Sequence, residues 1–308
     1  MPAALAVILI CRPTAPAFAQ DVEQGVDTSV APGDDFFTFA NGAWLRSTAI
    51  PEGRERWGVR NEIDELTRRQ IAALLDGAAA AVPGSTARKV ADFRAAWLND
   101  SAIEARGLAP LRPILDSLAR VRDKAALTRL LGRWIGADVD PLSWGIYQSA
   151  RLVGLSVEPG INGERTYPAF LLQGGLGLPD RDYYVSDEPR MQALRVRYQA
   201  YVGRLLALAG FDRADQRAEA VVALETLLAR SQATHAASAN DHNADHRWTR
   251  GDFAREAPGM DWAAFLDAAG LAHQDTIGVW QPGAITGLAA LVASTPLETW
   301  KDYLCAHL

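Results

Sequence analysis

His242 and His246 are the residues whose spacing comes nearest to that of a metal site. They stand four positions apart, with Asp241 and Asp245 beside them and His235 nearby. On a helix this spacing would place both imidazoles on one face, as in helical zinc sites. Asparagine and aspartate, which fill this segment, favour turns over helix interiors, and a turn would separate the two rings. We therefore expect a polar surface loop without metal ligands, with a structural zinc site as the alternative.

The sequence holds no recognisable catalytic motif. The His-Glu-x-x-His of helical zinc peptidases is absent, and no glutamate adjoins His242 to act as a general base. A Gly-x-Ser-x-Gly nucleophile elbow and a phosphate-binding loop are also absent. The glycines at Gly174, Gly175 and Gly177 are followed by Pro179 and lack phosphate-loop spacing. We accordingly predict no catalytic residue in this chain.

Composition and charge are those of an ordinary globular protein. Of the 308 residues, 49% are hydrophobic and 22% are charged, with a net charge of −6. No block of basic residues points to nucleic acid or to an anionic membrane as a partner. The two cysteines, Cys11 and Cys305, are too few for a disulfide framework. We expect Cys305 to be a buried or half-buried thiol.

The first residues are typical of an export signal. Residues 3–10 are apolar, and Ala17-Phe18-Ala19 has the small-x-small form of a cleavage site, which predicts a signal peptide over residues 1–19. The mature protein is then periplasmic or secreted. Lipidation at Cys11, which would hold it at the cell envelope, stays open, although Ile10 is large for a lipoprotein cleavage site. No later stretch approaches about 20 apolar residues, so we predict no membrane span beyond this leader.

Hydrophobic periodicity predicts a mainly α-helical fold with a small β element in the middle of the chain. Segments 142–157 and 167–172 are rich in β-branched and aromatic residues and are separated by turn residues, which indicates two or three short strands with a hairpin. Helices are predicted where apolar residues recur at a period near 3.6, namely over 34–44, 61–76, 87–99, from 101, 123–134, 191–206, 214–235, 261–271, 283–293 and from 295.

Capping residues support several of these helix starts. Asp34 and Asp35 place acidic groups at the positive end of the first helix. Asp123 and Ser101 are predicted N-caps, and Thr295 with Glu298 three positions on would form a capping box.

Three segments, in the same order and at the same separation, resemble one protein family. They are PGDDFFTFANGAWLRSTAIP at 32–51, QGGLGLPDRDYYV at 173–185 and TPLETWKDYL at 295–304. The chain is identified from them as similar to the N-terminal domain of the neprilysin, endothelin-converting enzyme and bacterial oligopeptidase O family of zinc metallopeptidases. The second segment is the most specific of the three. Its Asp180, Arg181 and Asp182 are expected to hold an irregular loop through charge-assisted bonds, with no catalytic role.

The resemblance implies a zinc metalloendopeptidase that cuts short peptides. Family members bind zinc through a His-Glu-x-x-His motif and a further glutamate in a C-terminal catalytic domain, and a large helical N-terminal domain covers that site. Zinc is then a cofactor of the complete family enzyme, and we expect none bound by this chain. The expected partners are short peptide substrates and the missing C-terminal catalytic half.

The resemblance also carries over one candidate binding position. In the family an arginine just after the Ile-Pro segment helps to bind the C-terminal side of the peptide, and here it falls on Arg56. A guanidinium suits a carboxylate because it offers a bidentate fork. The family residue five positions on is often aspartate, whereas here it is Asn61. The alternative is that Arg56 is a solvated loop arginine.

These observations predict three regions and one function. Residues 1–19 form the signal peptide, residues 20–60 form an N-terminal extended segment that would pack on the missing catalytic domain, and residues 61–308 form a multi-helix lid-type domain that is incomplete at its C-terminus. The chain would be the substrate-covering part of an exported metalloendopeptidase and inactive alone. The alternatives are a stand-alone helical peptide-binding module and a nonfunctional remnant.

Overall fold

The computed structural model describes residues 25–52, 54, 56–163 and 165–308. The predicted signal peptide with Cys11 lies outside these described residues. The chain divides into two compact units, Met1–Glu104 and Ala105–Leu308. The predicted boundary between residues 60 and 61 concerns packing on another domain and stays a prediction.

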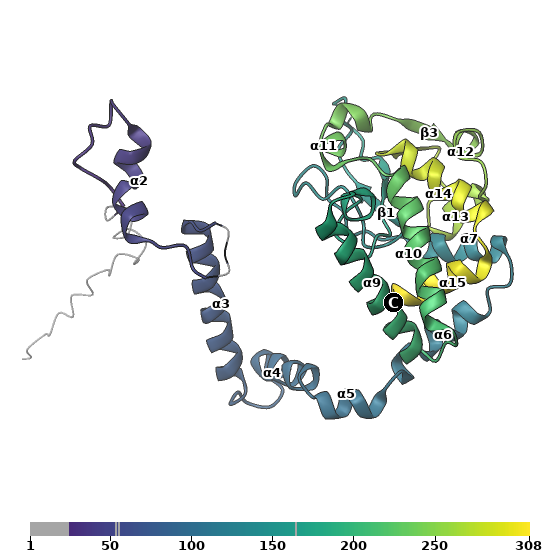
Figure 1. The fold of residues 1–308 in the computed structure, drawn as a ribbon, viewed down its shortest axis with the longest axis horizontal. Coiled ribbons are helices and arrows are strands. Elements are labelled where there is room, and N and C mark those ends of the chain that lie inside the picture. Colours follow the sequence, from purple (N-terminus) through teal and green to yellow (C-terminus); the bar gives the residue numbers. More distant parts are fainter. Residues whose placement is uncertain (1–24, 53, 55, 164) are drawn as a thin grey trace, which may run out of the picture. The chain divides into compact units, whose positions relative to one another are not determined.

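The regular secondary structure in the described part of the first unit is helical (Figure 1). The Asp35 side chain accepts a hydrogen bond from Thr38 N at 2.9 Å, which confirms the acidic helix start that the sequence predicts. The helices are α2 (Phe36–Ser47), α3 (Val59–Ala78), α4 (Thr86–Trp97) and α5 (Asp100–Arg106), the last of which crosses into the second unit. Neither α3 nor α4 contains a buried residue, so both keep their apolar stripes exposed within this unit.

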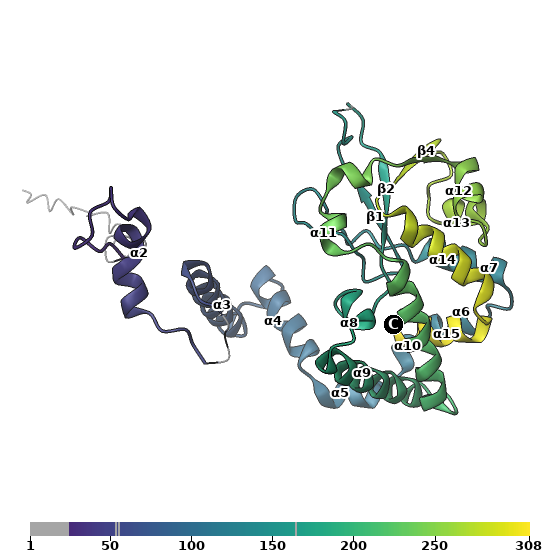
Figure 2. The ribbon, with the colours of Figure 1, turned by 45° about the horizontal axis from the view of Figure 1, so that its top comes forward.

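The second unit is mainly helical, as predicted. Its long helix α10 (Ala214–Ser231) contacts α8 (Asp182–Val185), α9 (Pro189–Leu208), α14 (Pro282–Ser294) and α15 (Leu297–Ala306). Figures 1 and 2 show α9 and α10 side by side. The remaining helices are η1 (Ala109–Leu111), α6 (Arg112–Ala119), α7 (Lys124–Arg133), α11 (His235–Ser238), η2 (Asp241–Ala244), α12 (Arg250–Glu256) and α13 (Trp262–Ala268).

A four-stranded sheet in the order β1-β2-β4-β3 forms the β element of the described residues. The predicted hairpin is present, because β1 (Val153–Val157) pairs antiparallel with β2 (Ala169–Gln173). The other two strands were not predicted from the sequence. Strand β4 (Thr276–Val279) runs parallel to β2, and β3 (Arg247–Thr249) is antiparallel to β4.

The core of the second unit lies between this sheet and the surrounding helices. All five residues of β2 are buried, as expected for a strand covered on both faces. An aromatic row of Phe253, Trp262 and Phe265 joins α12 to α13, with ring centroids 4.9 and 5.4 Å apart. Such pairs contribute about 0.5–1.5 kcal/mol each beyond the area they bury.

The helix caps agree with the sequence in part. Asp123 caps α7 through Ala126 N, as predicted. The predicted Thr295 capping box is wrong: Pro296 occupies the N-cap of α15, and no side chain caps that helix. Proline fixes φ near the value that the chain needs at this turn, so the chain enters the helix without a side-chain cap.

Two further predictions at helix ends are corrected. The helix predicted from Ser101 begins one residue earlier, at Asp100, and Asn99 Oδ1 accepts from Ala102 N at 3.0 Å. The helix predicted to reach His235 ends at Ser231, and His235 starts the separate short helix α11.

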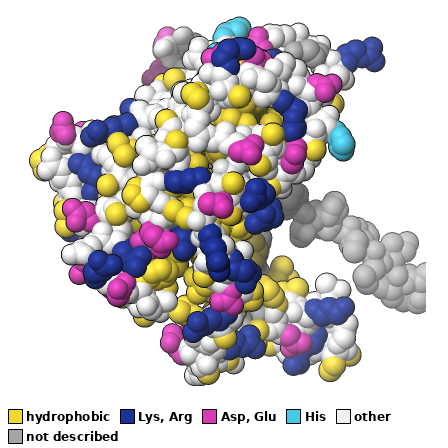
Figure 3. All heavy atoms as spheres, turned by 90° about the vertical axis from the view of Figure 1, so that its right-hand side faces the viewer, with side chains coloured by type: hydrophobic (Ala, Val, Ile, Leu, Met, Phe, Trp, Pro, Cys, Tyr) yellow, Lys and Arg dark blue, Asp and Glu magenta, His cyan; other side chains and the backbone are white. Residues whose placement is uncertain are grey.

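The described surface carries charges of both signs. On the face in Figure 3, lysine and arginine side chains are interspersed with aspartate and glutamate rather than gathered in one block. Within the described part of the chain, no helix is both long and apolar enough to span a bilayer.

Candidate functional site

The histidine pair singled out by its spacing lies on irregular structure. His242 lies in η2, a single 3₁₀ turn that ends at Ala244, and His246 follows beyond it. Asn240 Oδ1 accepts from His242 N at 3.2 Å, and Asp245 Oδ2 accepts from Asn162 Nδ2 at 2.7 Å. These turn interactions replace the helix that would have aligned the two imidazoles. Across the described residues, no group of three or more His, Cys, Asp or Glu side chains could hold a metal ion.

Arg56 and Asn61 flank the start of α3. Arg56 is exposed and lies two residues before Gly58, the N-cap, while Asn61 is half-buried in the first turn. Asn61 N donates to Gly58 O at 2.8 Å, and no side chain caps the helix. A helix N-terminus carries partial positive charge, and Arg56 adds a positive charge two residues before the N-cap. This arrangement suits a carboxylate, and the binding role of the two residues stays a prediction.

Neighbouring contacts order the segment around Arg56. Arg54 Nη2 lies 3.1 Å from Glu65 Oε1, and its guanidinium stands 5.9 Å from the centre of the Trp57 ring. Trp44 Nε1 donates to Glu62 Oε1 at 3.2 Å, which links α2 to α3. The carboxylates of α3 thus engage Arg54 and Trp44.

Charged groups of the Pro-Asp-Arg-Asp-Tyr-Tyr segment hold it, as expected, but the expected irregular loop ends at Asp182, where the short helix α8 begins. Asp180 Oδ1 accepts from Asp182 N at 2.7 Å, and Arg181 Nη1 donates to Asp182 Oδ1 at 2.9 Å. Tyr184 is buried at the end of this segment, and its hydroxyl accepts from Leu178 N at 2.8 Å. Helix α8 therefore places Tyr184 in the core.

A buried carboxylate, which was not predicted from the sequence, accepts a hydrogen bond from that tyrosine. Glu225 on α10 has no exposed surface. Tyr184 Oη donates to its Oε2 at 2.6 Å, and Tyr198 Oη donates to its Oε1 at 2.9 Å. His307 Nε2 lies 2.6 Å from the same Oε1. These partners come from α8, α9 and the end of α15, so one carboxylate joins four helices.

The electrostatics of this cluster act on its tyrosines. Burial, followed by the nearby Glu225 charge, raises the pKa of Tyr184 and of Tyr198 far above the ordinary tyrosine value. Burial also raises the pKa of Tyr303, whose hydroxyl donates to Gly175 O at 2.8 Å. The tyrosines therefore remain protonated donors at neutral pH. A buried carboxylate whose oxygens are supplied with donors in this way stabilises the packing of the helices around it.

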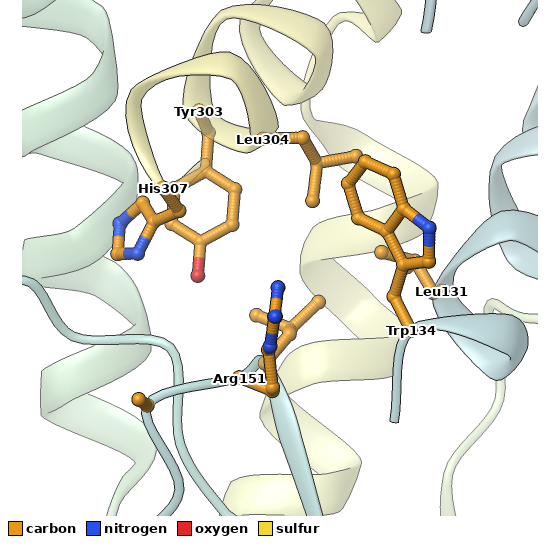
Figure 4. Close-up of a pocket in the computed structure, with 8 residues that line it drawn as sticks. Leu131, Trp134, Arg151, Tyr303, Leu304 and His307 are labelled. Atoms are coloured by element: carbon orange, nitrogen blue, oxygen red, sulfur yellow. The ribbon is translucent and has the colours of Figure 1, made fainter. Parts of the chain in front are cut away.

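A narrow pocket lies beside the cluster (Figure 4). Tyr303 and His307 lie next to each other on one side, Trp134 lies on the other, and Arg151 points into the space between them. The pocket volume is about 20 Å³, which is room for about one water molecule. It is too small to bind a substrate.

Comparison of the sequence with known proteins identifies the family of this chain. The sequence profile described as "Peptidase family M13", which represents the N-terminal domain, matches residues 32–308. The chain belongs to peptidase family M13. Mouse (Mus musculus) endothelin-converting enzyme-like 1 is 26% identical to it over 295 residues, covering 93% of this chain and 38% of the mouse protein. Bovine (Bos taurus) endothelin-converting enzyme 1 is 23% identical, covering 92% of this chain and 38% of its own length.

Solved M13 structures have the same fold. The zinc metalloprotease Zmp1 of Mycobacterium tuberculosis, in complex with an inhibitor, superposes with a TM-score of 0.67 at 25% identity, covering 92% of this chain and 42% of Zmp1. PepO of Lactobacillus rhamnosis gives a TM-score of 0.62 at 16% identity, a likeness of fold alone. The chain thus spans about two fifths of the length of these relatives. The predicted family and the mainly α fold with a small β element are confirmed.

Proposed function

We propose that this chain is the substrate-covering N-terminal part of an exported zinc metalloendopeptidase that acts on short peptides. The observation that carries the proposal is the M13 match over residues 32–308. The chain itself aligns with only 38% of the length of mouse endothelin-converting enzyme-like 1. The described residues do not fit a zinc site, because their His, Cys, Asp and Glu side chains form no ligand cluster. Zinc and its ligands would come from the remaining part of a longer protein.

The exposed apolar residues of the first unit support an association with such a part. On α2, Phe36 and Phe37 are 69% and 65% exposed. On α3 and α4, Leu74, Phe93 and Trp97 are 72–74% exposed. Phe93 and Trp97 stack with ring centroids 6.5 Å apart, and adjoining exposed apolar side chains mark an interaction site more often than scattered ones do. We propose that residues 20–60 pack on the catalytic domain, as the family resemblance implies.

Arg56 is the residue of this chain that we propose to bind substrate. The guanidinium would pair with the C-terminal carboxylate of the peptide, next to the uncapped start of α3, and Asn61 would contribute a neutral hydrogen-bonding group there. Such pairing fixes the register of the peptide without taking part in bond cleavage.

A complementation experiment tests the proposed function. The purified chain alone should give no chelator-sensitive cleavage of a short fluorogenic peptide. A chimera in which the chain replaces the matching region of M. tuberculosis Zmp1 should cleave that peptide, and a chelator should abolish the activity. Chelator-sensitive cleavage by the chain alone, or a folded chimera without activity, would contradict the proposal.

The same chimera tests Arg56. Arg56→Ala removes a charge-assisted hydrogen bond, so kcat/KM should fall about 10- to 100-fold for a peptide with a free C-terminal carboxylate. A peptide amidated at its C-terminus should be cleaved equally by both forms. Arg60→Ala, an exposed neighbour on α3, is the matched control. Equal losses in both variants would refute a specific role for Arg56.

A further inference from the structure

A row of arginines follows the exposed face of α9. Arg190, Arg197 and Arg204 stand seven positions apart in this helix, and all three side chains are exposed. Because seven residues are nearly two full turns of an α-helix, these side chains leave the helix on one face, about 10.5 Å apart along its axis. Figure 2 shows α9 at the lower edge of the second unit, next to α10. The three guanidinium groups form what we call the arginine row.

The charge of the arginine row is not balanced within the described structure. Helix α9 contains four arginines and neither aspartate nor glutamate, although the whole chain has a net charge of −6. The fourth arginine, Arg195, serves the fold, because its Nη1 donates to Tyr183 O at 2.8 Å and to Ser186 O at 3.0 Å. In the part of the chain that the structure describes, the side chains of the row make no ion pair and no hydrogen bond. They are therefore free to meet an anionic partner.

Exposed apolar side chains share this face with the arginine row. Val196, Tyr201 and Leu208 are 70%, 49% and 74% exposed. At 3.6 residues per turn, all three point within about 100° of Arg197 around the helix axis. A purely ionic ligand would leave these side chains in water, whereas a ligand with apolar groups would cover them. The face thus suits a partner that is both acidic and apolar.

Acidic residues lie next to both ends of the row. Asp187 and Glu188 directly precede α9, and Asp215 of α10 lies against Gly203, the neighbour of Arg204. A flat anionic surface that reached all three arginines would also meet these carboxylates, and like charges repel. A narrow segment that follows the helix axis meets the arginines alone. The row therefore suits an acidic segment better than a lipid bilayer.

From this charge and spacing we infer that the exposed face of α9 binds an acidic amphipathic helix of a partner protein. A helix packed along α9 presents residues seven positions apart at the same spacing of about 10.5 Å, so three carboxylates can meet the three guanidinium groups. An extended strand presents the side chains of one face about every 6.8 Å, which does not match the row. Apolar residues beside the carboxylates would cover Val196, Tyr201 and Leu208, as in other complexes in which an amphipathic helix docks.

Titration of the 308-residue chain with a fluorescently labelled peptide tests this inference, with fluorescence anisotropy as the readout. The probe is a helical peptide of three heptads that carries glutamate at one fixed position of each heptad and leucine and alanine on the adjoining face. We expect saturable binding that weakens as salt screens the charges. A peptide with glutamine in place of each glutamate should bind more weakly. A peptide of the same composition whose glutamates do not share a face should also bind more weakly.

Variants of the row separate specific pairing from general charge attraction. Replacing all three arginines by glutamine should weaken peptide binding about 3- to 150-fold, the combined effect of three exposed ion pairs. Glutamine and lysine have helix propensities close to that of arginine, so these variants should fold. The triple lysine variant keeps the charge and should retain most of the affinity. The matched control is Arg120→Gln with Arg122→Gln and Arg129→Gln, which removes equal charge from exposed residues outside α9 and should leave binding unchanged.

Four results would overturn the inference. They are the absence of saturable binding, equal losses of affinity in the two glutamine variants, equal binding of the peptide whose glutamates do not share a face, and tighter binding to phosphatidylglycerol vesicles or single-stranded DNA than to the peptide. The last result would assign the face to a membrane or to nucleic acid. This titration needs no catalysis, so the arginine row can fail to bind while the Zmp1 chimera is active, and the reverse can also occur.

Discussion

Replacing Glu225 by glutamine should destabilise the second unit strongly, because three polar side chains contact its carboxylate at once. The side chain is fully buried, and Tyr184, Tyr198 and His307 approach its two oxygens at 2.6–2.9 Å. Glutamine keeps the shape but places an NH₂ group against at least one of these donors. One hydrogen bond is then lost, and the others are made to a neutral amide instead of a charged carboxylate.

The magnitude follows from the value of hydrogen bonds to a charged group. Each contributes about 1.5–3 kcal/mol, and a neutral one contributes about 0.5–1.5 kcal/mol. Losing one bond costs about 1.5–3 kcal/mol, and weakening two others costs about 1–1.5 kcal/mol each, which gives a total of about 3.5–6 kcal/mol. For a unit of roughly 200 residues, that lowers Tm by about 7–24 °C.

Calorimetry at neutral pH measures this difference. Glu219→Gln is the matched control, because Glu219 is an exposed residue of the same helix and should change Tm little. If Glu225→Gln has the same Tm as Glu219→Gln, the carboxylate does not hold the four helices together and the prediction is wrong. The double variant Glu225→Gln, Tyr184→Phe should lose less unfolding free energy than the sum of the two single variants, because both substitutions disrupt the same hydrogen bond.

Three further outcomes follow from the structure. Gly278→Ala would place a methyl group 2.2 Å from the buried Phe170 ring and should lower the unfolding free energy by about 1–3 kcal/mol, as measured by urea titration. Burial raises the pKa of the Cys305 thiol to about 11. At pH 8, iodoacetamide should therefore alkylate Cys305 far more slowly in the folded chain than in the urea-unfolded chain. Equal alkylation rates would contradict the buried position of this thiol. The folded-state pKa values of Tyr184 and Tyr198 lie above the ordinary 10.0, so above that pH the unfolded chain loses protons that the folded chain keeps. The stability that these tyrosines contribute should therefore be fully present below pH 10 and be lost as the pH rises above it. A Tm that stays constant between pH 9 and pH 11 would show that the pKa values of Tyr184 and Tyr198 are not raised.

Local patterns predicted much of the fold. The start of α7 follows from Asp123 and the start of α2 from Asp35, because a capping side chain bonds within its own turn. The β1–β2 hairpin was also predictable, since alternating residues and the intervening turn lie close together in sequence. What is encoded within one turn or one hairpin can be recognised without knowledge of the rest of the chain.

The missed features depend on partners that are distant in sequence. Strands β3 and β4 have three and four residues, too few for a period to be recognised. The Glu225 cluster joins Glu225 to a residue 82 positions away in the sequence. One signal was present: Glu225 lies on the stripe of Val221, Leu224 and Leu228, and a carboxylate on a buried stripe requires partners. The sequence did not indicate which tyrosines and which histidine would supply them.

The position of β4 within the sheet has a consequence for the order of folding during synthesis. Phe170 and Leu171 of β2 pair with Gly278 and Val279 of β4, so more than a hundred residues separate the two strands along the chain. The ribosome delivers β1 and β2 first, and they form a hairpin whose outer edge has no neighbour until β4 emerges. Open strand edges invite pairing with other chains, and contacts this distant in sequence form slowly. A chaperone that shields the β2 edge in this interval would raise the yield of folded protein more than one that acts after release.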